Sequence, residues 1–219
     1  MTVTESLPVV DAVRRELEID EQVQEQRPRV RAVLTLTTNI ALAPAQLWPL
    51  LTRPQELARW FGPVTGELRE GGRFQALRGA EGRILRIEEP HQITLTWQQD
   101  GGEDPLQLRL DPEDDGSTSL RLRHAALVDR ETFTRVGPGG IAVRWEIALL
   151  ALAALTDGWR ATCLEPAPAP TPEWLHSAEG AAYVGAWSVR WAAQAIAAGV
   201  DEQTARRGEL ETARMILGG

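Results

Sequence analysis

Residues 141–159 read IAVRWEIALLALAALTDGW, and this stretch is rich in alanine and leucine. Its large apolar residues recur at the spacing of one helical stripe, which predicts a long helix. A long apolar helix that follows a set of short strands has its natural place on the concave face of their sheet. The stripe consists of Ile141, Trp145, Leu149, Leu152 and Leu155.

Short alternating segments fill much of the sequence before this helix. The first is RVRAVLTLTTNIAL from Arg29, in which Ala32, Leu34, Leu36 and Ile40 share one face. Turn signals then separate six further segments, as is typical of an antiparallel meander with one apolar and one solvated face. We therefore expect seven strands in an α+β fold. The six segments are VTGELRE, RFQAL, RILRIEE, QITLTW, PLQLRL and STSLRLRHA.

The stretch PAQLWPLLTRPQELARWFGP, residues 44–63, combines three large aromatic side chains with four prolines. Pro44 and Pro54 each suit the first turn of a helix, where the missing N–H would be unpaired in any case. We predict two short helices joined at an angle. Together they close one end of the sheet's groove, and Trp48, Trp60 and Phe61 form the plug.

Residues 1–28 form a polar extension in which acidic residues outnumber basic ones. Val13 and Leu17 have helical spacing, but few apolar residues follow them. This pattern predicts a frayed or loosely docked helix over residues 11–26, or a disordered segment, ahead of a main domain at 29–158.

A second appendage follows a stiff Pro/Ala linker at 159–172. Residues 173–219 predict a helical hairpin, with Gly199 ending its first helix and Asp201 capping the second. Tyr183, Trp187 and Trp191 form one stripe, too large an apolar surface to leave in water. The hairpin therefore docks on the chain's own long helix or groove mouth, or pairs with a second copy about a two-fold axis. We favour docking within the chain, where the partner surface is always close by.

The net charge of −8 argues against a nucleic-acid binder, which usually presents a basic face. All 23 basic residues are arginines, which excludes a Schiff-base lysine and the usual phosphate-binding GK[ST] loop. Cys163 is the single cysteine, and we expect it to be inert. No apolar run is long enough to span a membrane and no secretory signal is visible, so we expect a cytoplasmic location.

Five segments in this order carry a resemblance to a known family: APAQLWPLLTRPQELARWFGP, LREGGRF, ITLTW, RLRHAAL and GPGG with the helix after it. Over roughly residues 30–158 the chain resembles the helix-grip domains of the START/Bet v 1-like (SRPBCC) superfamily. It is most similar to the family named for homology to the activator of Hsp90 ATPase (AHSA1-like). The resemblance implies a seven-stranded antiparallel sheet around a C-terminal helix, with a largely apolar cavity between them. Relatives carry lipids, hormones or polyketide intermediates, and the eukaryotic namesake stimulates a chaperone.

Strand alternation and the helical stripe supply candidate ligand contacts in the groove. His124 continues the inward register of its strand, and the resemblance matches it to the family's histidine. It is either a core histidine bonded to the backbone or a polar contact to a ligand, with Arg144 or Glu146 near the mouth. We expect no metal and no cofactor, because no ligand cluster has metal spacing. The candidates are Leu36, Phe74, Leu85, Trp97, Leu108, Leu122, His124, Trp145 and Leu149.

Three functions remain open from the sequence. The first choice is non-catalytic binding of a small apolar or amphipathic molecule. The second is an enzyme of the cyclase or hydrolase type with His124 as general base, which needs a carboxylate such as Glu146 within reach of the imidazole. His91, at a hairpin, and His176, near the end of the linker, are weaker candidates for a functional role. The third, a cofactor of an Hsp90-type chaperone, rests on the family name alone and ranks last.

Overall fold

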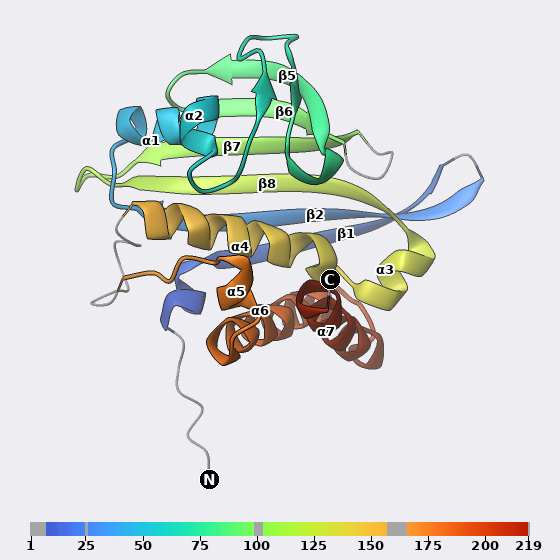
Figure 1. Cartoon of the computed structure of the whole chain (residues 1–219). Coiled ribbons are helices and arrows are strands. Elements are labelled where there is room, and N and C mark those ends of the chain that lie inside the picture. Colours follow the sequence, from blue (N-terminus) through green and yellow to red (C-terminus); the bar gives the residue numbers. More distant parts are fainter. Residues whose placement is uncertain (1–7, 25, 99–102, 157–165, 219) are drawn as a thin grey trace.

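The computed structural model describes residues 8–24, 26–98, 103–156 and 166–218. Eight strands form one antiparallel sheet in the order β1-β2-β8-β7-β6-β5-β4-β3, and the helices gather on one side of it (Figure 1). The strands are β1 Arg14–Gln24, β2 Arg27–Ile40, β3 Thr65–Gly66, β4 Arg73–Gln75, β5 Glu81–Glu88, β6 Gln92–Trp97, β7 Asp104–Pro112 and β8 Thr118–Asp129.

Strand β1 corrects the expectation of a helix over residues 11–26 and raises the number of strands from seven to eight. It pairs along its whole length with β2, and Arg15 lies opposite Leu36. Arg15, Leu17 and Ile19 face inward, so an arginine occupies a place that an alternating strand normally gives to an apolar residue. The arginine interrupts the period-two pattern, and Val13 and Leu17 alone have the spacing of a helix. A short 3₁₀ helix, η1 (Pro8–Ala12), precedes the strand.

The two proline-led helices confirm the expectation of two short helices within residues 44–63. Of the three aromatic residues expected to plug the groove, Trp48 is instead buried in the core and does not line the cavity described below. Helix α1 spans Pro44–Thr52 and α2 spans Pro54–Leu57, and each begins with its proline. The side chain of Gln46 accepts a hydrogen bond from the amide of Ala43 at 3.2 Å, which satisfies one free donor at the start of α1. Gly62 ends the segment with a φ of +119°, and a side chain at this position would collide with Leu77.

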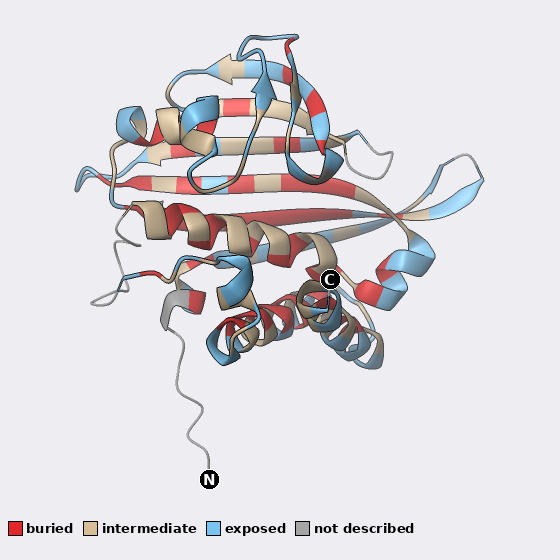
Figure 2. Ribbon diagram, in the orientation of Figure 1, coloured by how far each residue is buried: buried red, intermediate tan, exposed pale blue. Residues whose placement is uncertain are grey.

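The long apolar helix is α4, Gly139–Leu155, and it lies along the sheet (Figure 1). The short helix α3, Arg130–Val136, which the sequence patterns did not indicate, connects β8 to it. Buried residues concentrate on β2, β8 and α4, whereas residues 23–24 and 26–28, beside the β1–β2 turn, are exposed (Figure 2). A helix that is buried on both sides needs apolar residues around most of its circumference, which explains its composition.

The C-terminal helices form a third layer on the far side of α4 from the sheet (Figure 1). They are α5 Pro172–Leu175, α6 Ala178–Ala197 and α7 Glu202–Leu217. The side chain of Asp201 accepts a hydrogen bond from the amide of Thr204 at 3.0 Å, which confirms it as the cap of α7. The helix pair packs against α4, as expected for docking on the long helix, and not over the cavity described below.

Packing against α4 buries the aromatic stripe of α6 within the chain. Tyr183 is 4% exposed, Trp187 2% and Trp191 0%. The stripe was the reason to consider a homodimer through the hairpin, and that surface is already covered. Residues 159–165 of the expected linker, including Cys163, lie outside the described residues. Among the described helices, none alone is long and apolar enough to cross a membrane; α3 and α4 together pass by length and composition, but with a bend of 62° between them.

Candidate ligand cavity

A cavity of about 180 Å³ lies between the sheet, α4 and the segment that carries α1 and α2. Helices α1 and α2 contribute Leu51, Thr52 and Leu57, and α4 contributes Trp145, Leu149 and Leu152. The remaining wall consists largely of apolar residues on six strands and in the turn after α2. These include Trp60, Phe61, Val64, Leu68, Phe74, Ile84, Ile93, Leu95, Trp97, Leu106, Leu108, Leu120 and Leu122.

Five aromatic rings in the wall form one connected cluster. The rings of Phe61, Trp97 and Trp145 contact one another: Trp145 is stacked with Phe61 at 6.4 Å and meets Trp97 edge-on at 5.3 Å, and Phe61 meets Trp97 edge-on at 6.1 Å. Phe74 contacts Trp97 at 6.0 Å, and Trp60 contacts Phe61 at 5.5 Å. Offset and edge-on contacts at these distances are favourable, so the rings support one another around the cavity.

Six of the nine predicted ligand contacts line this cavity: Phe74, Trp97, Leu108, Leu122, Trp145 and Leu149. Leu36 does not, because it is completely buried in the core on β2, next to Leu122 of β8. Leu85 is 48% exposed, against the inward position expected from alternation. A register shift between Ile84 and Arg86 turns it outward, and Ile84 lines the cavity instead. Binding by any of these residues stays a prediction.

His124 lies behind the cavity wall and not in it. Its Nδ1 accepts a hydrogen bond from Nε1 of Trp145 at 3.0 Å, and its side chain is 3% exposed. Burial lowers the pKa of His124 to about 4, so the imidazole is neutral near pH 7. Neither alternative for His124 describes this position fully, since its partner is the side chain of Trp145 and His124 is not among the residues that line the cavity.

The carboxylate nearest to His124 is Asp104, which the sequence patterns did not single out. Its Oδ2 lies 3.8 Å from Nε2 of His124, and its Oδ1 accepts a hydrogen bond from the amide of Leu127 at 3.1 Å. Burial raises the pKa of Asp104, while the Leu127 amide and the charge of Arg29 oppose the rise. The strand register brings the two side chains together, because Leu106 on β7 lies opposite His124 on β8. Side chains on one face of a strand are two residues apart. Extending the inward alternation of β7 from Leu106 back by two positions therefore leads to Asp104.

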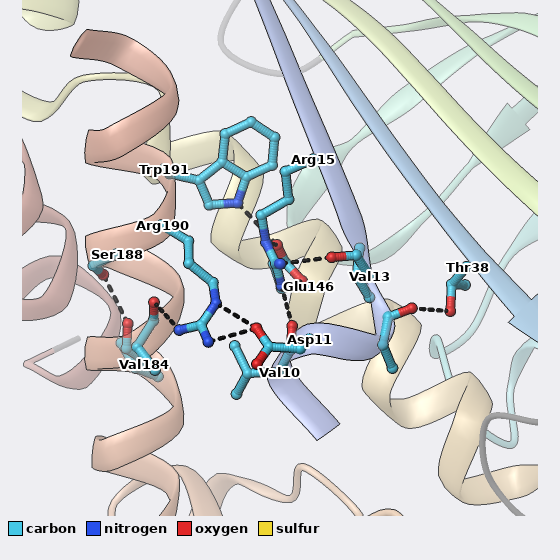
Figure 3. A network of polar contacts seen from close by, with 12 residues as sticks. Val10, Asp11, Val13, Arg15, Thr38, Glu146, Val184, Ser188, Arg190 and Trp191 are labelled. Carbon is cyan, nitrogen blue, oxygen red and sulfur yellow. Dashed lines mark hydrogen bonds and ion pairs between the residues drawn. The ribbon is translucent and has the colours of Figure 1, made fainter. Parts of the chain in front are cut away.

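Glu146, the carboxylate considered as a partner of His124, is directed instead toward Arg15 of β1 and Trp191 of α6 (Figure 3). It is 1% exposed and accepts two hydrogen bonds from Arg15, at 2.5 Å from Nε and 3.0 Å from Nη2. Trp191 of α6 donates to the same carboxylate at 2.9 Å. Arg15 also donates to the carbonyl oxygens of Val10 and Val13, at 2.7 and 2.6 Å. The pair thus joins η1, β1, α4 and α6, and neither of its side chains lines the cavity.

The other predicted polar sites do not join the cavity. His91 and His176 are exposed, and the Nδ1 atom of each lies within hydrogen-bond distance of a backbone carbonyl. Arg144 is not among the cavity-lining residues. Across the described parts of the chain, no three His, Cys, Asp or Glu side chains are grouped as metal ligands would be.

A curved antiparallel sheet packed on one long helix defines a helix-grip protein. Residues 41–157 match the family described as Activator of Hsp90 ATPase homolog 1-like protein, and the chain belongs to this family. No curated protein matches the chain.

Solved structures extend the likeness beyond the matched segment. The crystal structure of CalU16 from Micromonospora echinospora is 27% identical, with a TM-score of 0.60 over 84% of this chain and 98% of CalU16. The solution NMR structure of CalU16 gives 26% identity and a TM-score of 0.58 over 85% and 97% of the two chains. An HSP90 activator from Plasmodium falciparum is 22% identical, with a TM-score of 0.40 over 42% of this chain and 71% of that one. That similarity is too low to argue from.

Proposed function

We propose that the cavity binds a small apolar molecule and that the protein does not alter it chemically. The observation that carries this proposal is a space of about 180 Å³ walled by five aromatic rings and by aliphatic side chains. An engineered apolar cavity of roughly 150 Å³ in another protein stays dry and binds benzene, so a space of this size can hold a small ring or a short chain.

The polar hydrogens of the wall support an apolar ligand. Nε1 of Trp60 donates to the carbonyl oxygen of Leu50 at 2.9 Å, and Nε1 of Trp145 donates to His124 at 3.0 Å. The hydroxyl of Thr52 donates to the carbonyl of Trp48 at 2.8 Å. Because these three donors are already paired within the chain, this part of the wall has little to offer a hydrogen-bond acceptor on a ligand.

Binding is favoured over catalysis by the surroundings of the titratable groups. A general base needs a free imidazole nitrogen within hydrogen-bond reach of the substrate. Nδ1 of His124 is occupied by Trp145, and Nε2 faces Asp104. Glu146 is engaged with Arg15 and Trp191. A role beside an Hsp90-type chaperone, the function in the family's name, stays a prediction that a pull-down would test.

The test is a titration of the whole protein with toluene, followed by ¹H–¹⁵N NMR of the tryptophan indoles. We expect saturable shifts of the Trp97 and Trp145 signals. Ala148→Leu fills the cavity from α4 and should weaken binding about tenfold or more, because an overpacked site has no room for the ligand. Ala193→Leu, the same change at an exposed position of α6, is the matched control. Absence of saturable shifts, or equal binding by both variants, would contradict the proposal.

A further inference from the structure

The indole of Trp145 connects the aromatic wall of the cavity to the histidine behind it. It contacts Phe61, Trp97 and His124, at centroid distances of 6.4, 5.3 and 5.8 Å. Rotation of this side chain about χ1 or χ2 would therefore displace the rings of Phe61 and Trp97, which also line the cavity. A cavity of fixed shape requires that something hold the indole in one rotamer.

The hydrogen bond to His124 supplies that constraint, and it also fixes the state of the imidazole. An indole nitrogen can only donate, so Nδ1 of His124 must be the acceptor at 3.0 Å. In a neutral imidazole the proton is then on Nε2. The rings of His124 and Trp145 stand at 90° to each other, which is the geometry of an edge-on contact.

The far side of the imidazole is equally constrained. Its cross-strand neighbours are Leu34 of β2 and Leu106 of β7, which are 0% and 3% exposed. The protonated Nε2 has no hydrogen-bond partner among the described residues, and the nearest carboxylate oxygen is Oδ2 of Asp104 at 3.8 Å. A carboxylate on this side favours the tautomer with its proton on Nε2, which is the tautomer that Trp145 needs.

We propose that His124 is a positioning residue of the cavity: supported by Asp104, it holds the indole of Trp145 in the rotamer that shapes the ligand space, and it never touches the ligand. This role rests on the proposed binding function. It differs from a direct polar contact, because what the ligand meets is the apolar face of the indole. It also explains why a polar side chain lies directly behind an apolar wall.

The first experiment uses the unaltered protein. Long-range ¹H–¹⁵N NMR of the histidines should find His124 with a bare Nδ1 and a protonated Nε2 at pH 7. The Trp145 indole proton should exchange slowly and resonate downfield of an exposed indole. A proton on Nδ1 of His124, or a rapidly exchanging Trp145 indole proton, overturns the proposal without any variant having to fold.

The second experiment compares His124→Gln with His124→Leu, and uses His176→Leu as the matched control at an exposed histidine. The glutamine oxygen can still accept from Trp145, so this variant should keep the indole signal and bind toluene within about twofold of the wild-type Kd. The leucine cannot accept, and we expect the Kd to rise about tenfold, the equivalent of one buried hydrogen bond. A folded His124→Leu with unchanged Kd and indole signal overturns the proposal.

The outcomes separate this inference from the binding function itself. If the wild-type protein does not bind toluene, the proposed function fails, while the tautomer and the indole exchange still decide whether His124 positions Trp145. If toluene binds but His124→Gln is as weak as His124→Leu, the binding function stands and the positioning role is lost. A direct contact between His124 and ligand would instead shift the His124 nitrogen signals on titration and leave Trp145 unchanged.

Discussion

Helix α4 borders two different interiors, and the consecutive residues Trp145 and Glu146 each face one of them. Trp145 faces β8 of the sheet, where its indole donates to the neutral imidazole of His124 at 3.0 Å. Glu146 faces β1 and α6, where it accepts from Arg15 and from the indole of Trp191 at 2.9 Å. On each side a tryptophan N–H donates to one buried acceptor. The side of Trp145 borders the cavity, whereas the side of Glu146 contains the buried ion pair with Arg15.

The difference follows from what each side encloses. An unpaired polar atom in the wall of an apolar cavity costs free energy, and the N–H of Trp145 is paired within the chain. The side toward α6 has to attach two elements from opposite ends of the chain, and a charge pair with a fixed fork geometry provides direction as well as attraction. Arg190 of α6 repeats this attachment at the surface by pairing with Asp11 at 2.6 Å (Figure 3).

The largest effect is expected from breaking the charged side. Arg15→Met leaves Glu146 buried without its partner and should lower the free energy of unfolding by about 3–5 kcal/mol, measured in urea. Arg14→Met is the matched control, since Arg14 is exposed and its pair with Glu16 is worth little. The double variant Arg15→Met, Glu146→Leu should recover most of the loss. If it is no more stable than Arg15→Met, the buried carboxylate is not the source of the effect.

On the cavity side, the corresponding effect depends on pH. The pKa of His124 is lowered by burial from 6.5 to about 4, so the unfolded chain binds more protons than the folded one between these values. This contribution to stability is complete above pH 6.5 and declines as pH falls toward 4, by up to about 3 kcal/mol. The raised pKa of Asp104 and of Glu146 acts in the opposite direction. The difference between wild type and His124→Gln isolates the histidine; parallel stability curves over this range would contradict the assignment.

The smallest effect is the difference between replacing one tryptophan and the other by phenylalanine. Trp191→Phe and Trp145→Phe each remove three ring atoms, the nitrogen of the N–H among them, so both lose packing. The lost hydrogen bond adds about 1.5–3 kcal/mol at Trp191, whose acceptor is a buried carboxylate, and about 0.5–1.5 kcal/mol at Trp145, whose acceptor is a neutral imidazole. The two substitutions remove the same atoms, so each serves as the control for the other in urea unfolding. Equal costs, or a larger cost at Trp145, would mean that the two sides of α4 do not differ as described.

Much of the fold could be predicted because the signals were local. Alternating apolar residues identified seven of the eight strands, and the stripe of the long apolar stretch identified α4. Proline positions located α1 and α2, and Asp201 was recognised as a cap. Four cavity-lining residues on strands followed from the same alternation, and Trp145 and Leu149 followed from the helical stripe. Leu85 failed because a β-bulge changes the register between Ile84 and Arg86, and the sequence carries no glycine or other turn signal at that point.

The sequence by itself determined which segments form the sheet and that α4 is buried, because hydrophobic periodicity reports the local conformation and the need for burial. Only the tertiary structure decided that residues 14–24 are a strand. Arg15 can face inward there because Glu146, far away in the sequence, neutralises it, while the carbonyl oxygens of Val10 and Val13 accept its remaining hydrogen bonds. In the same way, Asp104 and Trp145 acquire their roles only when the sheet brings them to His124. Interactions between groups distant in sequence leave no periodic trace, since each residue alone is compatible with many environments.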